Sequence, residues 1–174
     1  MSTNFIILVV VFVVLLLVTL FMCLPILFGA PFEPSRMKRI KLMLKFSSPK
    51  KGQKVAELGS GNGKVAIEFA KVNPGIKVDG YEINPLLVLY SRRRIKKLGL
   101  EKQIKIYWKN FWKINLSKYD IISVFQVIFI MPKLEKKLKA ELKPGAKVIS
   151  NEWKFPNWHA KKSQGEVSLY VKEK

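Results

Sequence analysis

The sequence predicts an α/β domain in which a mostly parallel sheet ends in a C-terminal antiparallel hairpin, preceded by one N-terminal transmembrane helix. Three observations lead to this fold. An uncharged apolar run opens the chain, short β-branched runs then alternate with helical patterns, and the last two runs follow each other without a helix between them. Strands that alternate with helices form βαβ units, whose strands pair in parallel.

The chain divides into a transmembrane helix at 5–28, a linker and basic helix at 29–48, and a single domain at 49–174. Its 49% of hydrophobic residues supply one substantial core. The expected elements are strands at 54–58, 76–82, 104–110, 119–125 and 146–153, helices at 36–48, 64–72, 85–98 and 132–142, and hairpin strands at 158–162 and 166–172, with Ser-Gln-Gly as the turn.

The run 5–28 contains 24 residues and no charge. As a helix it would span roughly 36 Å, against roughly 30 Å of bilayer hydrocarbon. A cleaved signal peptide would be shorter and would begin with basic residues, whereas the leading segment MSTN has none, so the pattern favours an uncleaved anchor. Basic residues follow the run closely and none precedes it. The positive-inside rule therefore places the N-terminus outside and the domain in the cytoplasm.

The charge of the chain predicts an anionic partner. All 32 Lys and Arg residues and 11 of the 12 acids lie at or after Arg36, which gives this part a formal net charge of +21. An anionic membrane leaflet is the favoured partner, ahead of an acidic protein face, and nucleic acid is the least favoured of the three. Cys23 is the only cysteine and His159 the only histidine. A disulfide framework, a multi-histidine metal centre and cysteine nucleophile chemistry in the domain are thereby excluded, and no metal is expected.

A glycine-rich loop follows the first expected strand. Glycines at alternate positions let the backbone turn sharply and approach a ligand, and the next helix begins at once with its free N–H groups. The spacing differs from the dinucleotide fingerprint G-x-G-x-x-G because the third glycine comes one residue early. Glu57 precedes the loop, and its carboxylate would repel a pyrophosphate but suits an ammonium or sulfonium group. The loop residues are Gly59, Ser60, Gly61, Asn62 and Gly63.

A second acid, Glu82, ends the second expected strand, 19 residues after Gly63. A carboxylate at this place accepts hydrogen bonds from ribose hydroxyls. The alternative is that the glycines form only a tight turn and that Glu82 is a solvated acid. The combination of Glu57, the alternate glycines, Glu82 and the strand order favours a nucleoside ligand that carries a cation.

These residues resemble motif I of the class I S-adenosylmethionine-dependent methyltransferases, whose sheet is Rossmann-like. A narrower resemblance rests on the segments Pro31-Phe-Glu-Pro-Ser35, Gly80-Tyr-Glu-Ile-Asn-Pro85, Asn110-Phe-Trp112 and Phe155-Pro-Asn-Trp158. It points to the FAM173-type group of small, membrane-anchored protein-lysine methyltransferases. The resemblance implies S-adenosyl-L-methionine as the cofactor. Its methionine part would lie on 59–63 with Glu57 near its amino group, its ribose on Glu82, and its adenine between Asn110 and Phe111.

A lysine acceptor must lose its proton before it attacks the methyl group, because its ordinary pKa is about 10.4. Candidate residues that would position the acceptor follow the fourth and fifth strands: Phe125, Gln126 and Glu152. Glu152 has an equally open interpretation as a surface acid paired with a nearby lysine. Candidate substrate contacts are Phe32, Ser35, Trp153 and Trp158, and the aromatic ones could equally be packing residues.

We therefore expect a membrane-tethered methyltransferase that modifies a lysine of a membrane or membrane-proximal protein. A methyltransferase for a lipid, quinone or other small molecule is the alternative within the same class. A non-catalytic module that binds the cofactor at the membrane is the alternative from another class. The segment after the fourth strand, Phe125-Gln-Val-Ile, lacks the Pro-Pro-aromatic loop that accompanies methylation of the adenine amino group.

Overall fold

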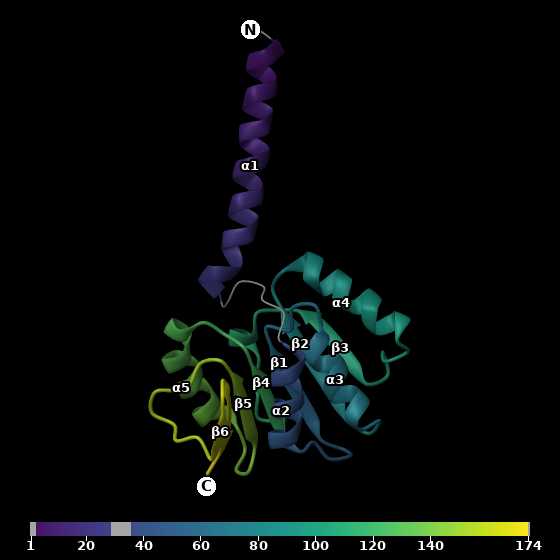
Figure 1. The fold of residues 1–174 in the computed structure, drawn as a ribbon, viewed down its shortest axis with the longest axis vertical. Helices are drawn as coiled ribbons and strands as arrows, with labels where there is room; N and C mark the ends of the chain where they lie inside the picture. The colour runs from purple at the N-terminus through teal and green to yellow at the C-terminus, as the bar shows by residue number, and fades with distance from the viewer. Residues whose placement is uncertain (1–2, 29–35, 174) are drawn as a thin grey trace.

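The structure is a computed structural model that describes residues 3–28 and 36–173, and Figure 1 shows its elements. Helix α1 (Thr3–Phe28) stands apart from the sheet and contains no charged residue. Its side chains are described at residues 3–16 and 19, all of which are exposed. Among the described residues, no helix combines the length and the apolar character that crossing a membrane requires.

The domain is built on a seven-stranded sheet with the order β3-β2-β1-β4-β5-β7-β6. The first five strands along the chain are parallel to one another, and the last two form the antiparallel C-terminal hairpin, with β7 placed beside β5. The strands are β1 (Lys54–Leu58), β2 (Lys77–Glu82), β3 (Ile104–Trp108), β4 (Ile121–Val124), β5 (Lys147–Asn151), β6 (Lys162–Gln164) and β7 (Val167–Val171).

Helices cover both faces of this sheet. One face packs against α2 (Met37–Ser47), α3 (Lys64–Val72) and α4 (Pro85–Lys97). The other packs against α5 (Met131–Glu141) and the segments that follow β3 and β5. Two short 3-10 helices, η1 (Phe111–Lys113) and η2 (Ile128–Ile130), complete the fold. Each face therefore has its own hydrophobic core, as the alternation of strands and helices predicts.

The ends of the elements follow from local chemistry. The side chain of Asn84 accepts hydrogen bonds from the backbone N–H groups of Leu86 and Leu87, which caps α4, and Pro85 occupies the first turn. Gly99 follows that helix with φ +66°, a conformation that glycine adopts without strain. The expected helices at 64–72 and 85–98, and the strand at 54–58, are confirmed within one residue.

The C-terminal hairpin is confirmed, but the bounds predicted for its first strand are wrong. That strand is Lys162–Gln164 and not 158–162, so the residues expected to form the turn belong to the strand. The hydroxyls of Ser163 and Ser168 lie 2.9 Å apart across the pair, and Gly165 takes the turn with φ +55°. Trp158 is withdrawn from the sheet because it packs against Phe155 and Tyr170.

Candidate functional site

The loops after the first three strands meet at the carboxyl edge of the sheet. β1 and β2 are adjacent and parallel, with Leu58 beside Tyr81, so the glycine loop and Glu82 leave the sheet side by side. β3 lies on the other side of β2, and the N–H of Lys109 donates to the carbonyl of Glu82 over 3.0 Å. Three segments far apart in the sequence are thereby brought to one place, as expected for an α/β ligand site.

Glu82 is the residue that connects these loops. Its side chain is buried, and its Oε2 accepts a hydrogen bond from the N–H of Gly61 at 2.8 Å. Its Oε1 accepts from the N–H groups of Ile83 at 2.9 Å and Asn84 at 2.8 Å. A carboxylate has about four lone-pair positions. One position on Oε2 therefore remains for a hydroxyl of a ligand.

A tyrosine pair supports β2 behind Glu82. The hydroxyls of Tyr81 and Tyr119 lie 2.6 Å apart, and the Tyr119 hydroxyl donates to Asp79 over 2.6 Å. Burial, followed by the hydrogen bonds to Asp79 and Tyr81, raises the pKa of Tyr119 far above its ordinary value. Tyr119 therefore stays protonated, and the pair fixes β2 against the core on this face.

The glycine loop has the left-handed backbone that its sequence predicts. Gly59, Gly61 and Gly63 have φ values of +78°, +51° and +72°. The N–H groups of Gly59 and Ser60 both donate to the carbonyl of Tyr81, at 2.9 Å and 3.0 Å. A side chain on Gly59 would place its Cβ 2.5 Å from Nε2 of Gln126, so only glycine fits beneath that amide.

Glu57 lies under the same loop, at the end of β1. It is 6% exposed, and its Oε2 accepts a hydrogen bond of 3.0 Å from the N–H of Ala66 in the first turn of α3. Burial raises the pKa of Glu57 well above its ordinary value, and the nearby charge of Glu82 adds to this effect, while the Ala66 N–H opposes it. Glu57 is thus an acid whose charge would be favoured by a cationic ligand.

Two buried polar atoms of this region have no hydrogen-bond partner among the described residues. They are Oγ of Ser60 in the glycine loop and Oε1 of Gln126, whose Nε2 donates to the carbonyl of Leu58 over 2.7 Å. Both side chains are about 3% exposed. Buried polar atoms are normally satisfied, so atoms of this kind mark a place for a polar ligand or water. The residues present therefore fit a polar cofactor on the glycine loop.

The predicted adenine contacts, Asn110 and Phe111, follow β3. The Asn110 side chain caps η1 by accepting from the N–H of Trp112 at 2.9 Å. Phe111 is 4% exposed and packs against the ring of Trp112, with 4.9 Å between centroids. Asn110 is half-buried at the edge, whereas Phe111 lies in the core beside it.

The predicted acceptor-side residues follow β4 and β5. Phe125 is half-buried and directly precedes the buried Gln126. Glu152 has the unusual φ of +79° and pairs with Arg39 of α2, with 3.2 Å between its Oε2 and the guanidinium. Arg39 also pairs with Glu166 in the hairpin turn. The interpretation of Glu152 as an ion-paired acid thus receives support, but its partner is Arg39 and not a lysine close in sequence.

The predicted substrate contacts lie in different surroundings. Trp153 is half-buried against the core of the α5 face, and its carbonyl accepts from the hydroxyl of Ser150 at 2.5 Å. Trp158 packs in an aromatic cluster, with its centroid 5.5 Å from that of Tyr170. Phe32 and Ser35 lie outside the described residues. Sequence reasoning missed Arg39 altogether, since it contacts a residue 113 positions later and no local pattern connects the two.

Comparisons with known proteins agree with this geometry. The family model described as the ANTKMT methyltransferase domain matches residues 57–162 of this chain. The chain belongs to this family. A lysine N-methyltransferase of Homo sapiens that is named for ATP synthase is 38% identical over 136 residues, which cover 78% of this chain and 57% of that protein. A protein-lysine N-methyltransferase of Saccharolobus islandicus is 30% identical over 131 residues, which cover 75% of this chain and 81% of that protein.

The family has the fold of S-adenosylmethionine-dependent methyltransferases. An RNA methyltransferase from Salinibacter ruber, solved with S-adenosyl-L-homocysteine, superposes with a TM-score of 0.76 at 21% identity, covering 82% of this chain and 95% of that one. The match covers only 54–62% of the length of four vertebrate lysine N-methyltransferases named for ATP synthase. This member of the ANTKMT methyltransferase domain family thus shares their methyltransferase domain over most of its own length.

Proposed function

We propose that this chain is an S-adenosylmethionine-dependent protein-lysine N-methyltransferase. The observation that carries the proposal is the link between Glu82 and Gly61, which unites the ends of β1 and β2 in a fold of this family. Curated relatives at 30% and 38% identity are named as lysine N-methyltransferases. The family assignment supports the chemistry, and the polar atoms at the carboxyl edge support the place where it occurs.

The cofactor would be held by residues of the three loops. Glu82 offers a lone pair to the ribose, the amides of 59–63 face the methionine part, Glu57 lies near its ammonium, and Asn110 and Phe111 border the adenine. S-adenosylmethionine supplies an electrophilic methyl group on a sulfonium. Everything else required of the protein is the positioning of a neutral acceptor nitrogen in line with that group.

Gln126 is the residue best placed to orient the acceptor. Its carbonyl oxygen has no partner among the described residues, it is fixed by the bond from its Nε2 to Leu58, and it lies on Gly59. A fixed carbonyl that accepts from a lysine N–H would aim the nitrogen lone pair toward the methyl group. Glu152 is less suited to this role because its carboxylate pairs with Arg39. It would instead shape the acceptor side from the end of β5.

We further propose that α1 tethers the enzyme to a membrane, with its N-terminus outside and the domain on the cytoplasmic side. The support is the sequence of residues 5–28, which carries no charge, and the basic residues that begin at Arg36. Two relatives act, by their names, on ATP synthase and on adenine nucleotide translocase. A lysine of a membrane or membrane-proximal protein is therefore the acceptor class that we favour for this chain.

The test uses the full chain in membranes of its host, with methyl-labelled S-adenosylmethionine and the variant Glu82→Ala. Hydrogen bonds to a charged group contribute about 1.5–3 kcal/mol, so cofactor affinity should fall roughly tenfold to a hundredfold. Label should enter a discrete protein band with the native chain and be lost with the variant. The matched control is Glu101→Ala, because Glu101 is an exposed acid in the turn after α4.

Each alternative has its own result. Label that partitions into the organic phase would replace the lysine acceptor with a lipid or quinone. Cofactor binding without transfer to any membrane component would indicate a non-catalytic module. Equal affinity for the cofactor in Glu82→Ala and Glu101→Ala, measured by calorimetry, would refute the proposed cofactor site.

A further inference from the structure

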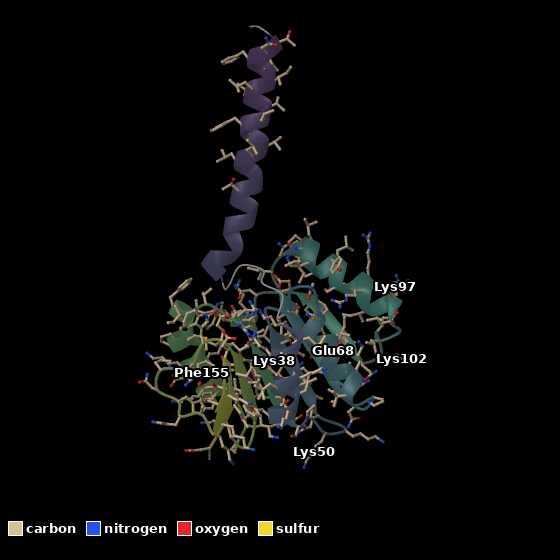
Figure 2. The ribbon with its side chains drawn as sticks, viewed as in Figure 1. Lys38, Lys50, Glu68, Lys97, Lys102 and Phe155 are labelled. Atoms are coloured by element: carbon tan, nitrogen blue, oxygen red, sulfur yellow. The ribbon has the colours of Figure 1, made fainter. Side chains whose placement is uncertain are left out.

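The direction of α2 determines where the chain enters the domain. Arg39, in the first turn of α2, pairs with Glu152, which directly follows the carboxyl end of β5. At the other end of the helix, the carbonyl of Ser47 accepts from Nζ of Lys147, the first residue of β5, over 2.6 Å. Helix α2 therefore runs antiparallel to the strands, and Arg36 lies at the carboxyl edge. In Figure 2, Lys38 accordingly lies nearer than Lys50 to the end from which α1 extends.

The length of the connection restricts the orientation of the domain. Eight peptide steps separate Phe28 from Arg36, which even fully extended reach at most roughly 28 Å. A compact domain of this size is roughly 37 Å across, from a radius of gyration of about 14 Å. If α1 lies in a bilayer, the connection is too short to turn the far edge of the sheet toward it with ease. The carboxyl edge, with the proposed cofactor site, is then the edge nearest the bilayer.

Exposed apolar side chains are concentrated at this same edge. The described part of the domain, residues 36–173, has nine large exposed hydrophobic side chains, and seven of them lie at the carboxyl edge. Met37 stands in the first turn of α2. Only Val72 and Leu98 lie at the opposite edge, where α3 and α4 end. The other six at the carboxyl edge are Leu86, Leu89, Tyr90, Trp108, Ile128 and Phe129.

The charges around these side chains are positive. Of the acids that the structure describes, four lie at this edge. Glu57 and Glu82 are buried, and Glu152 and Glu166 both pair with Arg39. Exposed basic residues surround them, including Arg36, Lys38, Lys109, Lys133 and Lys154. Lys133 lies 5.1 Å above the ring of Trp112. Apolar and aromatic side chains among lysines and arginines are the composition of protein surfaces that enter the headgroup region of anionic bilayers.

We propose that the carboxyl edge of the sheet is an interfacial surface that contacts an anionic lipid bilayer, with Leu86 and Phe129 among the side chains that enter it. This inference rests on the proposed tether and deepens the proposed function. The site would open toward the headgroup layer, so the acceptor would be a lysine at the level of the lipid headgroups. A lysine far out in the aqueous part of a partner would be out of reach.

The test places a fluorescent label at single cysteines of the full chain in a Cys23→Ser background. Leu86→Cys and Phe129→Cys report on the carboxyl edge. Val72→Cys and Leu98→Cys are matched controls, since these are also exposed apolar residues at helix positions but lie at the far edge. The protein is reconstituted into vesicles of phosphatidylcholine with phosphatidylglycerol, and a lipid-borne quencher is placed at the headgroup level. Labels at 86 and 129 should lose fluorescence, whereas labels at 72 and 98 should keep it.

The outcomes separate this inference from the proposals on which it rests. Chains that float with the vesicles while all four labels stay unquenched would overturn the interfacial surface and leave the tether standing. Failure to float would overturn both, while cofactor affinity in the same samples tests the methyltransferase site independently. Protection of the labels at 86 and 129 only when membrane proteins are added would reassign the surface to a protein and overturn the lipid contact. Equal quenching in pure phosphatidylcholine would overturn the requirement for anionic lipid.

Discussion

Gly80 has the tightest surroundings among the residues near the proposed cofactor site. A Cβ at this position would lie 2.5 Å from Cδ1 of Ile106, 2.8 Å from Cβ of Ser60 and 2.9 Å from its Oγ. Its role is therefore to let the glycine loop approach β2. The sequence alone presents Gly80 only as part of a family motif, and the close approach becomes visible in the packing.

We expect Gly80→Ala to displace the glycine loop and to destabilise the domain by about 1–3 kcal/mol, the usual cost of overpacking. Cofactor affinity should fall with it. Chemical denaturation and calorimetry measure the two effects. Gly75→Ala is the matched control, because a Cβ there meets only the flexible side chain of Lys51. Equal losses in the two variants would contradict the role of Gly80.

Glu57 gives a pH dependence whose sign follows from its burial. Its pKa is raised in the folded protein, mainly by burial, so the folded state holds this proton to a higher pH than the unfolded state. Its contribution to stability is therefore present at low pH and is lost as pH rises from the ordinary glutamate range through the raised pKa.

We expect Glu57→Gln to be more stable than the native chain at neutral pH, since the amide carbonyl can still accept from Ala66 and carries no charge. The difference should shrink as pH falls toward the ordinary pKa of glutamate. Denaturation of the cofactor-free protein across this range measures it. A difference that grows at acid pH would show that the direction assigned to the pKa is wrong.

At the scale of elements, Arg39 joins α2 to the end of β5 and to the hairpin turn. It reaches two acids, Glu152 and Glu166, that belong to separate strands. Helix α2 is otherwise held by Ile40 and Met43 in the core. Because partly exposed ion pairs are weak, this residue fixes the orientation of the helix more than it stabilises the fold.

We expect Arg39→Met to lower the free energy of unfolding by only about 1 kcal/mol while increasing backbone hydrogen exchange in the first turn of α2 and at residues 152–153. Lys38→Met is the matched control, since Lys38 is the exposed neighbour in the same turn. Exchange that is unchanged at residues 152–153 in Arg39→Met would argue against the link.

At the scale of the whole molecule, the proposed lipid surface and the proposed site share one edge. We expect the double variant Leu86→Ser/Phe129→Ser to methylate a membrane-bound acceptor more slowly and to keep the affinity of the native chain for S-adenosylmethionine, because neither side chain is assigned to the cofactor. The control is Val72→Ser/Leu98→Ser at the far edge. Rates on membranes and calorimetry with the cofactor separate the two effects. Equal rates in both double variants would leave no role for the edge in catalysis.

The sequence by itself determined the features that depend on short spacing. The alternation of strands and helices gave the α/β fold, because the hydrophobic period of each segment reflects its own geometry. The alternate glycines with Glu57, and Glu82 at the end of the next strand, located the cofactor loops, since parallel neighbours necessarily end at the same edge. The hairpin was predicted as a pair, but its register was not, because the packing of Trp158 decides which residues join the sheet.

Only the tertiary structure decided the contacts between distant segments. The partner of Glu152 is 113 positions away, and the unpartnered carbonyl of Gln126 appears only when β4 is placed beside β1. The gathering of Leu86, Trp108 and Phe129 at one edge depends on the direction in which each helix returns across the sheet. Local patterns determine which elements form, whereas strand order and helix direction decide which side chains share a surface, and no local spacing encodes that arrangement.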